Sequence, residues 1–132
     1  MEITVTQEQA GKLVTILHVK GEINSTTHQQ FEDKAREVYE AGARNVLVDL
    51  AEVNYLSSAG IRALNQILIM LRTDAPEETD AAMSKGVRDG TWVSPHLKLA
   101  NASKSVKEVL KIAGMDMLID VYDDTKKAVE AF

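Results

Sequence analysis

The first hydrophobic positions of the chain form short runs of β-branched and aliphatic residues. Ile3 and Val5 alternate with polar residues, and a second apolar run follows at residues 13–19. Gly11 lies between the two runs, where a glycine allows the positive φ angle that a tight turn favours. The pattern therefore predicts a β-hairpin, with Gly21 at the end of its second strand.

Helical spacing replaces this pattern after residue 24. Apolar side chains recur at intervals of three and four residues, which is typical of an amphipathic helix. These positions are Phe31, Ala35, Val38 and Tyr39. Thr26 followed by Gln29 fits a capping box at the start of this helix, and Gly42 fits the position just after its end. The run 45–50 is then almost continuously apolar, as expected of a buried strand.

A second amphipathic helix is predicted after residue 60. Ser57 or Ser58 stands at its start, and serine is a preferred capping residue. The recurring apolar positions are Ile61, Leu64, Ile67, Leu68 and Leu71. Residues 72–95 then break the pattern with both prolines of the chain, two glycines and an acidic run. We predict an insertion there, between this helix and the next strand.

The last third of the chain again alternates strand and helix. Residues 97–100 form an apolar run that predicts a buried strand. Ser103 caps a third predicted helix, which ends at Gly114. The run 118–122 predicts a final short strand, and Asp124 opens a C-terminal helix.

The order of these elements predicts one α/β domain over residues 1–132. Strands that alternate with helices favour a largely parallel sheet, connected by right-handed crossovers. A length of 132 residues is sufficient for one hydrophobic core. Hydrophobic content of 45% and charged content of 27% are typical of a globular domain and argue against disorder.

Composition narrows the possible functions. The 15 basic and 20 acidic residues give a net charge of −5, which is unfavourable for binding nucleic acid or an anionic membrane. Without cysteine the chain has no disulfide, thiol nucleophile or cysteine-ligated metal. The three histidines are scattered, and no nucleophile–base pair is visible, so we expect no enzyme activity, metal or cofactor.

The N-terminal segment and the most apolar stretch of the chain together predict a cytoplasmic protein. The first residues carry neither the basic nor the apolar segment of a secretory signal. The most apolar stretch, 61–71, is too short and too polar to span a bilayer of about 30 Å. We therefore expect no direct membrane insertion. The oligomeric state stays open between a monomer and a weak homodimer.

The window 49–60 is the most informative for function. Two serines stand where a buried strand is followed by the start of a helix. Unpaired backbone N–H groups and a partial positive charge at that position accommodate a phosphate well. Ser58 is therefore a candidate for regulatory phosphorylation. In the alternative interpretation, Ser57 and Ser58 only cap the helix.

This window also resembles the core motif of the STAS family, the sulphate transporter and anti-sigma factor antagonist domains. The resemblance covers Val48–Leu50 and Val53–Leu64, and three further segments agree in the correct order. Residues 19–24 resemble the family's Gly-Glu-Leu-Asp strand end, residues 103–114 its third helix, and residues 121–128 its C-terminal part. These segments are spread along the chain, and the resemblance extends over nearly its whole length except the predicted insertion.

The resemblance implies a STAS-like mixed sheet with an N-terminal hairpin and about four helices, and a role as a binding module. In the stand-alone members, a serine at this helix start is phosphorylated by a partner that is both anti-sigma factor and serine kinase. The unmodified protein binds that partner and frees the sigma factor, and a serine phosphatase resets the system. The resemblance thus implies a partner-switching pathway of bacterial transcription regulation. Matched residue by residue, it implies that Ser58 is the phosphoacceptor. The implied partner-binding residues are Asn24, Ser25, Thr26, Ser57, Ser58, Ala59, Gly60, Ile61 and Arg62.

Two positions depart from the family pattern. Ser57 replaces an Asp that often precedes the phosphoacceptor, and Asn24 replaces the Asp of the Gly-Glu-Leu-Asp motif. Both changes remove a carboxylate, so the local charge is less negative than the family pattern implies. Ser57 is a second candidate acceptor, which the residue-by-residue match favours less than Ser58. The alternative function is an accessory subunit of a membrane transport or signalling complex, without regulated phosphorylation. A carrier of nucleotides or lipids is a third possibility.

Overall fold

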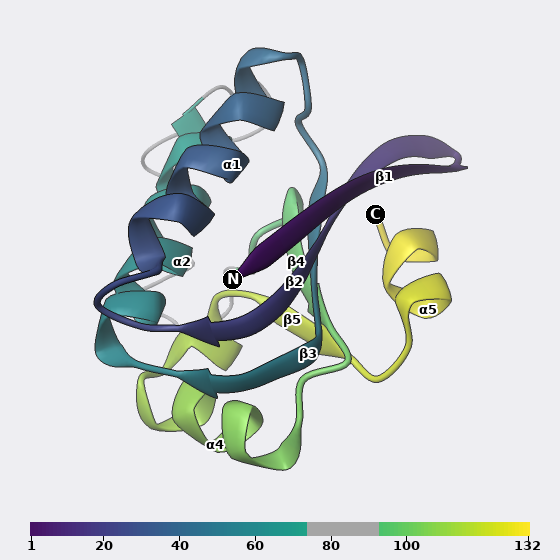
Figure 1. Cartoon of the computed structure of the whole chain (residues 1–132). Coiled ribbons are helices and arrows are strands. Elements are labelled where there is room, and N and C mark those ends of the chain that lie inside the picture. Colours follow the sequence, from purple (N-terminus) through teal and green to yellow (C-terminus); the bar gives the residue numbers. More distant parts are fainter. Residues whose placement is uncertain (74–92) are drawn as a thin grey trace.

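The computed structural model describes residues 1–73 and 93–132. It contains five strands and four α-helices within these residues, in the predicted order of hairpin, helix, strand, helix, strand, helix, strand and helix. With the labels of Figure 1, the elements are β1 (Glu2–Ala10), β2 (Lys12–Ile23), α1 (His28–Glu40), β3 (Val46–Leu56), α2 (Ser58–Thr73), β4 (Leu97–Ala100), α4 (Lys104–Ile112), the short 3-10 helix η1 (Met115–Met117), β5 (Asp120–Tyr122) and α5 (Thr125–Glu130).

The strands form one mixed sheet in the order β1-β2-β3-β4-β5. β1 and β2 pair in antiparallel orientation through a tight turn at Gly11, whose φ is 80°. All the other neighbouring strands are parallel. The predicted hairpin and the predicted largely parallel sheet are thus both confirmed.

Helices cover both faces of the sheet. Figure 1 shows α1 and α2 together on one side and α5 on the other. The main core lies between the sheet and α1, α2 and α4, and its buried residues include Phe31, Leu50, Leu64 and Leu110. A smaller core lies under α5, where Ala128 and Val129 pack on Ile16 and Leu47. The parallel strands are therefore buried on both faces, which explains their continuous apolar runs.

Two strand ends were predicted too early. β2 does not end at Gly21: this glycine lies inside the strand with φ 112°, and the pairing of β2 with β3 is irregular between His18 and Glu22. Past this irregularity the pairing continues to Ile23 and Leu56, so β3 also runs beyond Leu50. A glycine at a bulge interrupts the pattern of a strand without ending it.

The predicted capping box at Thr26 is wrong. α1 begins at His28, and neither Thr26 nor Gln29 caps it. Instead the side chain of Asn24 accepts hydrogen bonds from the backbone N–H groups of Thr26 (2.9 Å) and Thr27 (3.2 Å). This local turn satisfies backbone donors of the loop that leads into α1.

The remaining helix ends follow the prediction. Ser103 and Asp124 accept hydrogen bonds from the first turns of α4 and α5, and Gly42 and Gly114 adopt positive φ after α1 and α4. The final strand is shorter than predicted, because residues 118 and 119 follow η1 outside β5. Most of the predicted insertion over 72–95 lies outside the described residues. Among those residues, no helix is both long and apolar enough to cross a membrane.

Candidate functional site

The carboxyl ends of β2 and β3 bring two distant segments together. Ile23 is paired with Leu56, and the backbone N–H of Ser57 donates a hydrogen bond to the carbonyl oxygen of Ile23 at 2.9 Å. The predicted site residues 24–26 and 57–62 follow these two strand ends directly. The structure thus places both predicted segments at one edge of the sheet, where parallel strands of α/β folds present their functional loops.

Asn24 organises the loop that leads into α1. Besides the two backbone donors of the turn, its side-chain oxygen accepts a hydrogen bond from the hydroxyl of Thr26 at 2.8 Å. Its amide nitrogen donates to a carboxylate oxygen of Glu22 at 3.1 Å. A carboxylate therefore lies beside position 24 even though the family's Asp is absent there. Ser25 and Thr26 are exposed on this loop.

The two serines at the start of α2 differ in their surroundings. Ser57 is half-buried, and its hydroxyl oxygen accepts a long hydrogen bond of 3.4 Å from the N–H of Gly60. Its carbonyl accepts the first helical hydrogen bond, from Ile61. Ser58 is the first residue of the helix and is exposed. Ser57 is thus the capping residue, and the hydroxyl of Ser58 stays accessible.

Gly60 allows α2 to start this close to the sheet. A Cβ atom at this position would lie 2.9 Å from the carbonyl oxygen of Ile23 and 2.5 Å from a methyl carbon of Leu56. Real Cβ atoms essentially never approach other atoms so closely. Ala59 and Gly60 are both buried, so they offer little surface of their own and help to position the serines.

A groove runs between the first turns of α2 and the end of α4. It has a volume of about 420 Å³, and its lining is mainly apolar. The residues that line it are Ser58, Ile61, Arg62, Val109, Ile112 and Ala113. Ile112 is 88% exposed, the highest value among the exposed large hydrophobic side chains of the described residues.

The α4 side of this groove was missed by sequence reasoning. Val109 and Ala113 lie on the apolar stripe that predicts the helix, but Ile112 falls outside that stripe. An isoleucine on the otherwise charged face of α4, next to Lys111, is the signal that marks it. Contact between α4 and α2 depends on the tertiary fold, so spacing along the chain does not indicate it.

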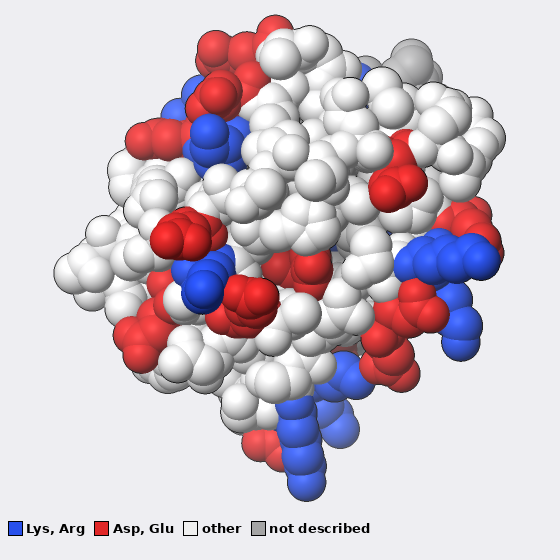
Figure 2. Space-filling view, turned by 45° about the vertical axis from the view of Figure 1, so that its right-hand side comes forward, with Lys and Arg blue, Asp and Glu red and all other residues white. Residues whose placement is uncertain are grey.

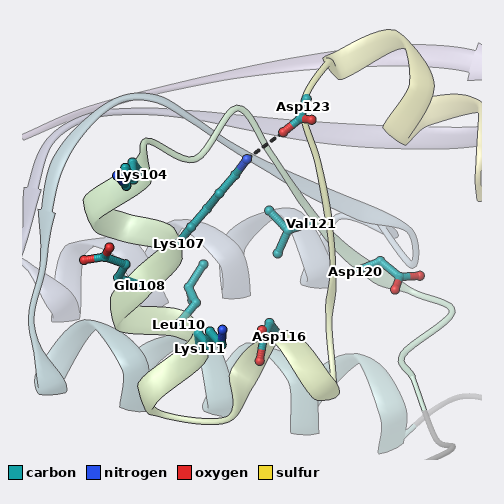
Figure 3. Close-up of a pocket in the computed structure, with 9 residues that line it drawn as sticks. All are labelled: Lys104, Lys107, Glu108, Leu110, Lys111, Asp116, Asp120, Val121 and Asp123. Atoms are coloured by element: carbon teal, nitrogen blue, oxygen red, sulfur yellow. Dashed lines mark hydrogen bonds and ion pairs between the residues drawn. The ribbon is translucent and has the colours of Figure 1, made fainter.

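A second hollow, on the other side of α4, has a different character. It lies between α4 and β5 and has a volume of about 600 Å³, and its lining combines lysine and carboxylate side chains with Leu110 and Val121 (Figure 3). Lys107 extends across it and donates a hydrogen bond of 2.7 Å to Asp123. This bond holds the pKa of Asp123 below its ordinary value. Within this hollow, the charges of Lys107 and Asp123 therefore compensate each other.

Mixed charge is also found on the face of the molecule that carries α5. Figure 2 shows basic and acidic side chains interspersed there, without a continuous area of one sign. Lys20 of β2 and Glu52 of β3 approach to 3.9 Å. In the described residues, no group of three or more His, Asp or Glu side chains is placed to hold a metal ion. In the groove beside Ser58, an exposed apolar side chain and a modifiable hydroxyl line the same surface.

Comparison with known proteins agrees with this architecture. The model of the STAS domain family matches residues 4–75. A Bordetella bronchiseptica protein named "Putative anti-sigma factor antagonist BtrV" is 27% identical over 122 residues, which cover 92% of this chain and 87% of that protein. The match extends over nearly the full length of both proteins.

Solved structures show the same fold. A Thermotoga maritima protein of the same description as BtrV superimposes with a TM-score of 0.73 and 17% identity, over 97% of this chain and 92% of that one. The unphosphorylated anti-sigma factor antagonist SpoIIAA superimposes with a TM-score of 0.58 and 12% identity, over 94% and 92%. SpoIIAA from Bacillus in its phosphorylated form gives 0.59 and 12%, over 96% and 97%. With its matching sequence model and its SpoIIAA-like sheet, the chain belongs to the STAS domain family.

Proposed function

We propose that this protein is an anti-sigma factor antagonist of the cytoplasm, a binding module without catalysis of its own. Its partner is an anti-sigma factor that is also a serine kinase, and phosphorylation of Ser58 controls their association. A serine phosphatase returns the protein to its binding form. The similarity to BtrV over 92% of the chain supports this assignment.

One observation carries the proposal. The exposed hydroxyl of Ser58 lies on the rim of a mainly apolar groove, next to an isoleucine that is almost fully exposed. Exposed apolar surface favours association with a protein partner, because association removes it from water. A serine on the rim allows a single modification to change that surface.

Phosphorylation of Ser58 would control binding through a local change in charge on the groove's rim. Phosphorylation adds about −1.5 to −2 charges and three strong acceptor oxygens. Ser58 is the first residue of α2, where the helix dipole tolerates negative charge, so the domain stays folded. Burial of the phosphate against an apolar partner surface would require its desolvation, which disfavours the complex. A coupling of about 1–3 kcal/mol is sufficient for a useful switch.

Phosphate mapping tests the proposal. The protein is incubated with its cognate anti-sigma kinase and ATP, and the modified residue is located by mass spectrometry. We expect phosphate on Ser58, none on a Ser58→Ala variant, and normal phosphorylation of a Ser57→Ala variant. Phosphate on another residue, or equally tight kinase binding by wild type and Ser58→Asp, would contradict it.

A second function is favoured by the residues at positions 24 and 57. Both lack the family's carboxylate, and the side chain of Asn24 is engaged in the loop and with Glu22. This arrangement suits a permanent docking surface, as in an accessory subunit of a membrane transport or signalling complex. In that case a Ser58→Asp variant would keep its place in the complex, and no kinase would modify Ser58.

A further inference from the structure

Ser58 and Arg62 are neighbours on the surface of α2. They are four residues apart, so one lies a helical turn above the other, with about 5–6 Å between their Cβ atoms. Both are exposed, and both line the groove between α2 and α4. Within the described part of the chain, Arg62 forms no ion pair and no hydrogen bond.

The charges around the groove make Arg62 distinctive. It is the one charged residue among the groove's lining residues. On the β2 side, Asn24 donates a hydrogen bond of 3.1 Å to the carboxylate of Glu22. On the α4 side, Lys107 is bonded to Asp123, and Lys111 and Glu108 line the other hollow. A negative group added to Ser58 would therefore find its adjacent cation in Arg62.

We propose that Arg62 is the internal counter-ion of phosphorylated Ser58. The phosphate and the guanidinium form a charge-assisted pair within α2, with the acidic group N-terminal to the basic one, which is the favourable order on a helix. The proposal rests on the proposed function, because it concerns the same phosphorylation. It assigns to Arg62 a role in regulation that the other site residues do not share.

Pairing would change the groove in two ways at once. The phosphate places charge on the α2 rim, and the guanidinium becomes engaged with it. The unmodified protein instead offers a partner an unpaired cation beside an apolar surface. Phosphorylation thus removes one polar contact and makes the rim harder to dehydrate, without any movement of the backbone.

The test needs no kinase. Phosphoserine is incorporated at position 58 of the full chain by genetic encoding, and the second pKa of the phosphate is measured by phosphorus NMR. An adjacent guanidinium stabilises the doubly charged form, so this pKa should be lower in wild type than in Arg62→Gln, by about 0.3 or more. Arg62→Lys, which keeps the charge, should recover most of the decrease.

A charge-matched control separates a local pair from the general field of the protein. Lys126 is exposed on α5, which covers the opposite face of the sheet. Lys126→Gln removes one positive charge there and should leave the phosphate pKa unchanged. Equal values in wild type and Arg62→Gln, or an equal increase in Lys126→Gln, would overturn the proposal. Because the phosphate is incorporated directly, these outcomes do not depend on whether a kinase modifies Ser58.

Discussion

Two polar regions, one in the middle of strands β2 and β3 and one beyond their carboxyl ends, differ in how their side chains are satisfied. In the middle of these strands, Asp49 is the centre of a hydrogen-bonded network. It accepts from His18 Nδ1 at 2.7 Å and from Asn101 at 2.9 Å. The network continues from His18 to Thr6 on β1 and from Asn101 to Thr125 at the start of α5.

The strand ends present the opposite case. Ser58 and Arg62 are exposed on the first turns of α2, and Ile112 exposes most of its side chain beside them. The residues that shape the backbone there, Asn24, Thr27 and Ser57, use their side chains in hydrogen bonds to it.

The comparison distinguishes polar side chains that stabilise the fold from polar side chains that are exposed to a partner. The Asp49 network joins three strands, a loop and a helix, so its hydrogen bonds stabilise the arrangement of the sheet and α5. The exposed side chains of Ser58 and Arg62 on the rim of the groove do not join elements of the fold in this way. They are accessible to a partner, and the hydroxyl of Ser58 is accessible to modification. Substitutions should therefore reduce stability in the network and partner binding at the rim.

Gly60 should give the largest loss of stability, because it is the part of the site that is packed as tightly as a core. In Gly60→Val the added side chain meets Leu56 and the backbone of Ile23. We expect a destabilisation of about 3 kcal/mol, at the upper end for overpacking. Urea denaturation measures it. Ser58→Val places the same side chain at the exposed neighbour and should cost under about 0.5 kcal/mol. Equal effects of the two variants would show that the close approach is absent.

Asp49→Ala should destabilise the domain by about 2 kcal/mol, because it removes acceptors from the partly buried His18 and Asn101. Its side chain is only 15% exposed, so water replaces it incompletely. The measurement is thermal or urea unfolding, and kinase binding should stay within twofold of wild type under conditions where both are folded. A loss of binding at unchanged stability would contradict the division between the two regions.

Ser57→Ala should cost about 0.5–1 kcal/mol through loss of the α2 cap, whose hydrogen bond is long. Ser58→Ala should change stability by less than that, since its hydroxyl caps nothing in the structure. The pair is compared by denaturation at neutral pH. A larger loss of stability in Ser58→Ala would mean that Ser58, and not Ser57, is the structural serine.

The smallest expected effect is on how the free energy of unfolding depends on pH in the acidic range. Burial acts to raise the pKa of Asp49, but hydrogen bonds from Asn101, Ala51 and His18 outweigh it, and the pKa lies below its ordinary 3.8. The unfolded chain therefore binds this proton more readily, and the stabilisation present above pH 3.8 is lost as the pH falls through the folded-state value. Denaturation from pH 6 to pH 3 should show a smaller acid-induced loss in Asp49→Asn than in wild type. Identical slopes would refute this role for Asp49.

The order of elements could be predicted from sequence, because apolar spacing and end signals such as Ser103 and Gly114 are local. The long ends of β2 and β3 could not. Past Leu50, buried residues recur every third position, at Val53 and Leu56, and the strand persists because each end supports the other across the sheet. Asn24 likewise replaced the predicted cap with its own turn.

The candidate site was predictable on its two strand-end segments and not on its third side. Residues 24–26 and 57–62 follow from the motif, and the pairing of Ile23 with Leu56 brings them together. The apposition of α4 to α2 depends on packing between residues about fifty positions apart, which spacing alone does not reveal. Ile112 carried the only local signal, as an apolar residue outside the apolar stripe of its helix.

The proposal that phosphorylation of Ser58 controls association is tested most directly by the affinity of the anti-sigma kinase for this protein. The affinity is compared between the unmodified protein and the protein phosphorylated at Ser58. Isothermal titration calorimetry of the two forms measures it. We expect phosphorylation to weaken binding by about 10-fold or more, within the usual range of such couplings, while both forms unfold at similar denaturant concentrations. Equal affinities of two equally folded forms would contradict it.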